Sequence, residues 1–319
     1  MPVSPLADFR ALFGRIPPID AAQRNGVAAV FERAGVGGSQ LAVIAAMVAG
    51  LTGRKPAVSR PSLTLFAGTH GVARHKVSAR RIDSTLATVA AAGSGDAPAN
   101  QLCAVNMVGL KVYDLALHLP TGDIAAEPAM DERTLAATFA FGMEAIAGGA
   151  DLVLLSAIRS AGDEAVAAAL LTAVAGGDAA DWGSAEAAPA VRQALSRHGS
   201  AADPLALFGQ LGGREFAGIA GAILAARIER IPVVLDGMTA LAAACVLRAV
   251  DPASVEHCLL AAAEDEPMRR AAAWLGVRPL VGANVSAGEG TAAVLASTIV
   301  KDALALHAGL AAHAPAHSH

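Results

Sequence analysis

The sequence is poor in charged residues and in aromatic side chains. Charged residues make up 16% of the 319 residues and aromatic residues 3%, and no Lys/Arg cluster is interleaved with aromatic side chains. The 24 basic and 28 acidic residues give a net charge of −4. We therefore expect no nucleic-acid partner and no anionic-membrane surface, which leaves small molecules or proteins as ligands.

Cysteine is also scarce. Cys103, Cys245 and Cys258 are odd in number and share no CxxC spacing. This pattern argues against a disulfide framework and favours a reducing compartment. The stretch MPVSPLADFRALFGRIPP carries Asp8 and Arg10 and lacks the apolar segment of a signal peptide, so we expect a cytoplasmic protein.

Long uninterrupted apolar runs are missing, although 54% of the residues are hydrophobic. The apolar stretches are rich in alanine and broken by Arg, Glu or Gly, as in AGIAGAILAARIERIPVVLDG. This pattern is typical of buried helices and strands rather than of membrane spans. We expect no membrane segment.

Short apolar runs bounded by Gly, Pro or Asp fit the pattern of fully buried parallel strands. Ala-rich segments with helical periodicity lie between them, for example residues 164–174 and 238–250. Strand followed by helix, repeated along the chain, predicts an α/β fold with a doubly wound parallel sheet flanked by helices. The predicted strands are residues 61–71, 108–117, 151–157 and 231–237.

The two ends of the chain lack the strand pattern. We expect residues 1–60 to form the N-terminal part of a small helical subdomain, residues 61–290 the α/β core, and residues 291–319 a C-terminal helix that joins the subdomain, followed by a His-rich tail. The tail histidines could chelate a metal, but no carboxylate or cysteine accompanies them. We favour an unstructured tail and expect no metal site.

The loops after the predicted strands are the candidate binding loops, because ligands of doubly wound sheets bind beyond the carboxyl ends of the strands. In LSAIRSAGD, Arg159 and Gly162 could hold an anion at a helix N-terminus. Alternatively, Asp163 caps that helix, which would make the loop less suited to phosphate. Asp236 ends another predicted strand and is a further candidate, although the glycines around it could serve close packing alone.

Two glycine-flanked stretches carry the remaining candidates. FAGTHGVARHKVSA (66–79) could close over a flat heterocycle with His70 and Ser78, or could be a Gly-rich turn with an exposed histidine. VSAGEGT (285–291) places Glu289 between Gly288 and Gly290, which let a ligand approach the main chain. The alternative there is a solvated loop before a helix N-terminus.

Taken together, FAGTHGVA…VSA, EPAM (127–130), LGGREFAGIAGAILAARIERIPVVLDG and AGEGTAA occur in the order and spacing of one known family. The chain resembles nicotinate-nucleotide:dimethylbenzimidazole phosphoribosyltransferases. The resemblance implies phosphoribosyl transfer from nicotinate mononucleotide to 5,6-dimethylbenzimidazole or a related aromatic base, giving α-ribazole 5′-phosphate and nicotinate for the lower ligand of cobalamin. It also implies a parallel sheet flanked by helices and a homodimer. We expect no cofactor.

The resemblance implies roles for individual residues. Glu289 matches the family's general base toward the benzimidazole N–H. Together with the loops above, it leads us to expect the aromatic base against Ser78, His70 and Gly288. The residues expected to bind the nucleotide and its phosphate are Asn100, Ser156, Arg159, Gly162, Gly212, Gly213 and Asp236.

The sequence departs from the family at the phosphate loop. Where the family has a Gly-rich loop with Asn-Thr-Thr, this chain has SAIRSAGDEA, with Ala157 in place of a Glu and with Asp163 and Glu164, which would repel phosphate. Replacement contacts could come from Arg159, Arg269 and Arg270. An alternative function is therefore a divergent paralogue without independent activity, acting as a ligand-binding protein or as one subunit of a heteromeric transferase.

Overall fold

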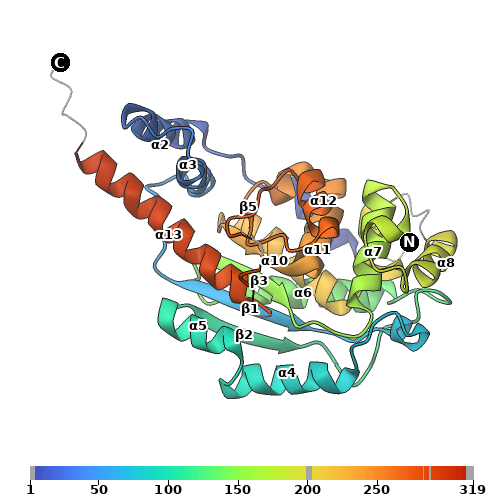
Figure 1. The fold of residues 1–319 in the computed structure, drawn as a ribbon. Helices are drawn as coiled ribbons and strands as arrows, with labels where there is room; N and C mark the ends of the chain where they lie inside the picture. The colour runs from blue at the N-terminus through green and yellow to red at the C-terminus, as the bar shows by residue number, and fades with distance from the viewer. Residues whose placement is uncertain (1–3, 199–202, 283, 287–288, 314–319) are drawn as a thin grey trace.

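The computed structural model describes residues 4–198, 203–282, 284–286 and 289–313. Five parallel strands form one sheet in the order β2-β1-β3-β4-β5 (Figure 1). The four predicted strands are confirmed, and a fifth, β5, was not predicted. The strands are β1 (Pro61–Ala67), β2 (Gly109–Asp114), β3 (Leu152–Ala157), β4 (Val233–Leu235) and β5 (Cys258–Leu260).

Both faces of the sheet are buried, as the predicted doubly wound fold requires. Along β3, Val153 and Leu155 belong to one hydrophobic core, whereas Leu152 and Leu154 belong to a second core on the opposite face. The period of two along a strand thus explains why these runs are apolar at every position.

One core is covered by helices from the middle of the chain. α10 packs against α6 and α11, and α11 packs against α7 and α12. Gly221 allows the α6–α10 approach, because a Cβ there would lie 2.1 Å from the Phe139 carbonyl oxygen. The helices on this side are α1 (Ala7–Ala11), α6 (Glu132–Ala145), α7 (Asp163–Ala175), α8 (Ala188–His198), α9 (Pro204–Gln210), α10 (Arg214–Ile228), α11 (Gly237–Val250) and α12 (Glu266–Leu275).

The other core is covered by helices from the two ends of the chain and from the segment between β1 and β2. These are α2 (Ala21–Arg33), α3 (Gln40–Thr52), α4 (Ile82–Ser94), α5 (Pro98–Asn106) and α13 (Thr291–Ala312). Short 3₁₀ turns complete the structure: η1 (Phe13–Arg15), η2 (Gly71–His75), η3 (Ala179–Asp181) and η4 (Pro252–Val255).

The C-terminal helix α13 links the sheet to the N-terminal helices. It contacts β1, β3 and β4 near its start and also packs against α2, α3 and α5 (Figure 1). Among the described residues it is the one helix long and apolar enough to cross a membrane, and 44% of that apolar window is buried inside the protein. Its apolar side chains, such as Val294 and Val300, therefore serve the core.

The strand order also fixes where a site can lie. The chain goes from β1 to its neighbour β2 on one side and then crosses to β3 on the other side. At such a switch point the loops after β1 and β3 diverge and leave a crevice at their carboxyl ends, so the carboxyl edge of the sheet is where a site is expected.

Candidate active site

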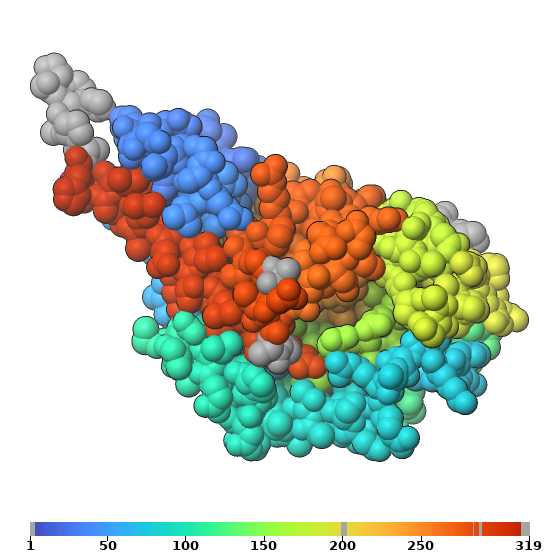
Figure 2. Space-filling view, viewed as in Figure 1, coloured from blue at the N-terminus to red at the C-terminus, as the bar shows by residue number. Residues whose placement is uncertain are grey.

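A cavity of about 470 Å³ lies beyond the carboxyl ends of β3 and β4. Figure 2 shows the surface hollowed where the orange C-terminal segments meet the yellow-green and cyan parts of the chain. A volume in this range suits a nucleotide-sized molecule. The lining residues are Ser156, Ala157, Arg159, Asp163, Glu164, Trp182, Gly183, Ser184, Asp236, Gly237, Met238, Thr239, Glu264, Asp265, Pro267, Met268, Ser286 and Glu289.

Two glycines with left-handed backbones shape the walls of this cavity. Gly162 caps α7 with φ 95°, and a Cβ there would lie 3.0 Å from a Val72 methyl carbon. Gly290 caps α13 with φ 80°, as the glycine-flanked pattern around Glu289 suggested. Because other residues rarely adopt this conformation, these glycines fix where Asp163 and Glu289 leave the main chain.

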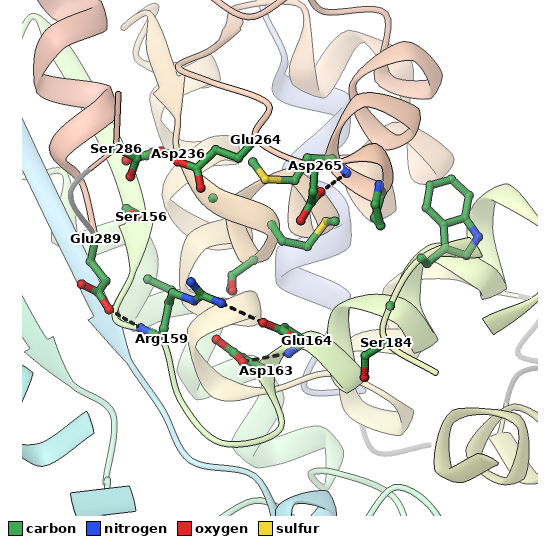
Figure 3. A pocket seen from close by; sticks show the side chains of 18 residues that line it. Ser156, Arg159, Asp163, Glu164, Ser184, Asp236, Glu264, Asp265, Ser286 and Glu289 are labelled. Atoms are coloured by element: carbon green, nitrogen blue, oxygen red, sulfur yellow. Dashed lines mark hydrogen bonds and ion pairs between the residues drawn. The ribbon is translucent and has the colours of Figure 1, made fainter. Parts of the chain in front are cut away.

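The N–H groups of the β3–α7 loop are hydrogen-bonded to carboxylates of the chain itself. The Ser160 N–H donates to Oδ2 of Asp163 at 3.0 Å, and the Glu164 N–H donates to Oδ1 of the same side chain at 2.8 Å. The Arg159 N–H donates to Oε1 of Glu289 at 3.2 Å (Figure 3). The helix end where the sequence suggested a bound anion is thus occupied by Asp163.

The cavity is strongly acidic. Among the described residues that line it, Arg159 is the one basic side chain, and it pairs with Glu164 at 2.7 Å. Figure 3 shows the acidic side chains around the cavity. They are Asp163, Glu164, Asp236, Glu264, Asp265 and Glu289.

Two of these carboxyl groups titrate near neutral pH. Burial raises the pKa of Asp163 from 3.8 to about 6. Burial also raises the pKa of Asp236 from 3.8 to about 7, and the carboxylates of Glu264 and Glu289 add to that shift. Since burial disfavours unpaired negative charge, a cationic ligand would be stabilised here and an anionic one repelled.

His70 lies behind the cavity wall instead of lining it. Its side chain is fully buried, and its Nε2 atom lies 2.6 Å from Oε1 of the equally buried Glu215. Burial disfavours the charged imidazole, but the carboxylates of Glu215 and Asp163 outweigh it, so the pKa of His70 is raised above 6.5. Gly213 leaves room for this pair, because a Cβ there would lie 2.5 Å from Cε1 of His70.

Ser78 lines a second, neighbouring cavity of about 560 Å³. The two cavities share Arg159, Glu164 and Ser184. The other residues that line the second cavity are Lys76, Val77, Ala79, Arg80 and Glu186.

Other sequence candidates lie away from both cavities. The Asn100 side chain donates to the Ala92 carbonyl and accepts from the Ala97 N–H, so it caps α5. Gly212 packs against Phe208. Gly288 lies outside the described residues.

The two arginines considered as replacement phosphate contacts point to carboxylates elsewhere. Arg269 pairs with Glu266, and Arg270 pairs with Asp181. The structure therefore brings together Ser156, Arg159, Asp236 and Glu289 around the first cavity, while Gly162 orients the loop.

The sequence did not reveal the cavity wall formed by Glu264 and Asp265. These residues follow β5, which is only three residues long and shows no recognisable strand pattern. Glu215 was also missed, although an acidic residue in the first turn of a largely apolar, buried helix is a signal of a buried partner. Among the described residues, no group of three or more His, Cys, Asp or Glu could hold a metal ion.

Comparison with known proteins places the chain among transferases. A family model described as "Phosphoribosyltransferase" matches residues 32–317. The nicotinate-nucleotide:dimethylbenzimidazole phosphoribosyltransferase of Agrobacterium fabrum is 45% identical over 325 residues, covering 96% of this chain and 93% of the relative. The enzyme of the same name from Rhizobium etli is 45% identical over 328 residues, covering 98% and 96%.

The solved structures agree with the sequence relatives. The crystal structure of the enzyme of this name from Thermus thermophilus superposes with a TM-score of 0.84 at 26% identity, covering 93% of this chain and all of the other (100%). The similarity thus extends over both the sheet and the terminal helices.

Proposed function

The chain belongs to the family of nicotinate-nucleotide:dimethylbenzimidazole phosphoribosyltransferases, and from this premise we propose how its cavity performs the reaction. The enzyme transfers phosphoribose from nicotinate mononucleotide to 5,6-dimethylbenzimidazole, giving α-ribazole 5′-phosphate and nicotinate in cobalamin synthesis. The observation that carries the site assignment is Glu289, which reaches the 470 Å³ cavity from a Gly-capped turn.

Glu289 is the proposed general base. Benzimidazole must lose its N–H proton as its nitrogen bonds to the anomeric carbon of ribose, while the bond from that carbon to nicotinate breaks and its electron pair leaves with nicotinate. A carboxylate held at the cavity by the Arg159 N–H is suited to accept this proton. Because the electron pair of the ribose–nicotinate bond leaves with nicotinate, the ribose carries a partial positive charge in the transition state.

The acidic lining suits that positive charge. Preorganised carboxylates stabilise a cation that develops in a site screened from water. Asp236 lies at the end of β4 and Ser156 at the end of β3, where they face the same cavity as Glu289. We assign Asp236 to the ribose and its developing charge, and Ser156 to a hydroxyl contact.

One observation favours the alternative, a paralogue that does not catalyse transfer alone. Asp163 accepts the Ser160 and Glu164 N–H groups that a phosphate at the start of α7 would need. An active enzyme must therefore hold the phosphate elsewhere, whereas a subunit of a heteromer would take that contact from its partner.

The test is a product assay with nicotinate mononucleotide and dimethylbenzimidazole. Wild-type protein should release nicotinate and form α-ribazole 5′-phosphate. Glu289→Gln should lower kcat by roughly 10²- to 10⁴-fold, the usual contribution of a positioned base. Glu264→Gln removes a carboxylate from the same cavity and should cost about tenfold or less, because it alters only the field around the reacting atoms.

The outcome that contradicts the proposal is unambiguous. If wild-type protein binds both substrates yet forms no product, the chain is not an independent transferase. If Glu264→Gln and Glu289→Gln lose equal activity, Glu289 is not the base.

Two further expectations concern the state of the enzyme. We expect a homodimer, as the resemblance implies, and support comes from Val105 and Met107, which are 80% and 83% exposed at the end of α5. Light scattering at micromolar concentration tests this expectation.

We also expect cytoplasmic localisation, which fits cysteines that are all buried and unpaired.

A further inference from the structure

We propose that the buried ion pair of His70 and Glu215 is a positioning element for the reaction, which holds Asp163 at the start of α7 and, through the β3–α7 loop, fixes Glu289. Neither member of the pair lines either cavity, so the pair acts through Asp163 and not on the substrate. The inference rests on the proposed function for the role of Glu289.

The chain leaves a closely fitted space for this pair. His70 follows β1, Glu215 lies in the first turn of α10, and their side chains are 0% and 1% exposed. A Cβ at Gly68 would lie 2.0 Å from Oε2 of Glu215, one at Gly213 would lie 2.5 Å from Cε1 of His70, and one at Gly162 would lie 3.2 Å from Cβ of His70. The loop after β1 and the starts of α7 and α10 therefore close around the pair.

The charges of the buried side chains depend on one another. Burial disfavours the imidazolium, but Glu215 and Asp163 raise the pKa of His70 above 6.5, while Arg214 opposes that rise. Burial raises the pKa of Asp163 to about 6, and the Ser160 N–H and the charge of His70 hold it from rising further. A charged imidazole thus allows two carboxylates to stay ionised in the protein interior.

Asp163 transmits this charge to the main chain. Its carboxylate accepts the Ser160 N–H at 3.0 Å through one oxygen and the Glu164 N–H at 2.8 Å through the other. An ionised carboxylate accepts at both oxygens, whereas a protonated one carries a hydrogen on one of them. The ionised state of Asp163 therefore keeps the β3–α7 loop closed.

Arg159 connects the loop to the proposed base. Its N–H donates to Oε1 of Glu289 at 3.2 Å, and its carbonyl accepts from the Thr85 hydroxyl at 3.1 Å. Ser160, which is bonded to Asp163, is the next residue, so a displaced Ser160 N–H moves the Arg159 peptide as well. Misplacement of a reacting group by about 1 Å can lower a rate roughly a hundredfold.

The experiment removes the charge of the imidazole. His70→Gln leaves Glu215 and Asp163 as two buried carboxylates without a cation, so kcat should fall roughly tenfold to a hundredfold. KM for dimethylbenzimidazole should stay within about twofold, because the pair lines neither cavity. His257→Gln is the matched control: His257 is equally buried and bonds the Ile223 carbonyl away from both cavities, so kcat should be that of wild type.

A double variant separates charge from packing. In His70→Gln/Glu215→Gln the carboxylate left unpaired by the first change is neutral as well, so Asp163 can ionise again. The double variant should therefore recover about fivefold or more of the kcat lost in His70→Gln. A loss of packing alone would leave the double variant as slow as the single variant or slower.

Amide hydrogen exchange tests the loop without turnover. In His70→Gln the segment 157–164 should exchange about tenfold faster than in wild type or more, because the hydrogen bonds of the Ser160 and Glu164 N–H groups weaken. In His257→Gln it should exchange as in wild type. Faster exchange in His70→Gln, combined with no turnover in wild type, would support the positioning pair and reject the proposed transferase activity.

The proposal is overturned if His70→Gln keeps wild-type exchange, if its kcat falls no further than that of His257→Gln, or if neutralising Glu215 restores no activity. A rise in KM for dimethylbenzimidazole as large as the fall in kcat would also overturn it. Asp163→Asn carries the same test if His70→Gln does not fold: exchange should quicken by a similar factor, and wild-type exchange would reject the proposal.

Discussion

The two cavities share a wall but differ in charge. The first contains six acidic side chains, Asp163, Glu164, Asp236, Glu264, Asp265 and Glu289, and one arginine. The second shares Arg159 and Glu164 with the first and adds Lys76, Arg80 and Glu186. The first cavity therefore favours cations, whereas the second contains side chains of both signs.

Arg159 offers the largest test of this difference, because its guanidinium borders both cavities. Arg159→Ala should raise KM for nicotinate mononucleotide by roughly tenfold to a hundredfold, the usual range for a lost charge-assisted hydrogen bond. Its effect on kcat should be smaller, because the Arg159 N–H that holds Glu289 belongs to the main chain and is retained. Steady-state kinetics at varied nucleotide concentration measures both parameters.

The control is Arg192→Ala. Arg192 is also an exposed arginine paired with a carboxylate, Asp178, but it lies outside both cavities. Equal rises in KM for the two variants would mean that Arg159 acts on stability rather than on the substrate.

The buried carboxyl group of Asp236 in the acidic cavity should make the unfolding free energy depend on pH. Folding raises the pKa of Asp236 from 3.8 to about 7, so between these values the folded state binds more protons than the unfolded chain. Its contribution to stability is fully present below pH 3.8 and is lost as the pH rises through about 7. Wild-type protein should therefore lose unfolding free energy between about pH 5 and pH 8.

In Asp236→Asn, the fall in unfolding free energy between about pH 5 and pH 8 should be smaller than in wild type by on the order of 2 kcal/mol. This figure follows from about 1.4 kcal/mol per pKa unit and partial relaxation of the buried site. Urea unfolding at the two pH values measures it. Asp302→Asn, at an exposed position on α13, serves as the control. A pH dependence that is the same in wild type and Asp236→Asn would show that Asp236 is ionised in both states at these pH values.

The smallest expected effect is that of salt. Raising NaCl from about 0.05 to 0.5 M should weaken binding of nicotinate mononucleotide by about threefold, because the half-exposed guanidinium of Arg159 is screened by salt. Binding of dimethylbenzimidazole, which carries no phosphate, should change little. An equal response of the two ligands to salt would remove the distinction between the cavities.

The sequence predicted the fold well because β1, β3 and β4 are buried at nearly every position and largely apolar, whereas the edge strand β2 is only partly buried. β5 (Cys258–Leu260) escaped detection because it lacks the Pro and Gly boundaries that mark the equally short β4 and continues directly into a run of alanines. Because β5 was not predicted, Glu264 and Asp265, which follow it, were not recognised as part of the cavity wall. The site prediction thus failed where a strand lacked the boundary residues that distinguish a short strand from the surrounding apolar sequence.

His70 illustrates a second limit. The glycines on either side of it suggested a loop open to a ligand, but His70 is held by Glu215, a residue far away in the sequence. A pairing between distant elements leaves no local trace, so spacing alone could not separate a buried histidine from a ligand contact. Glu289 was easier to identify, because its glycine flanks and its family resemblance lie in one short stretch.

The hydrogen bonds of the β3–α7 loop have a consequence for the thermodynamics of binding. The Ser160 and Glu164 N–H groups already have acceptors on Asp163 before any ligand is present. Fixing the backbone of one residue costs about 1–2 kcal/mol in conformational entropy, and here that cost falls on folding. A substrate entering the cavity meets a loop that is already ordered, so its binding free energy is not reduced by ordering the protein.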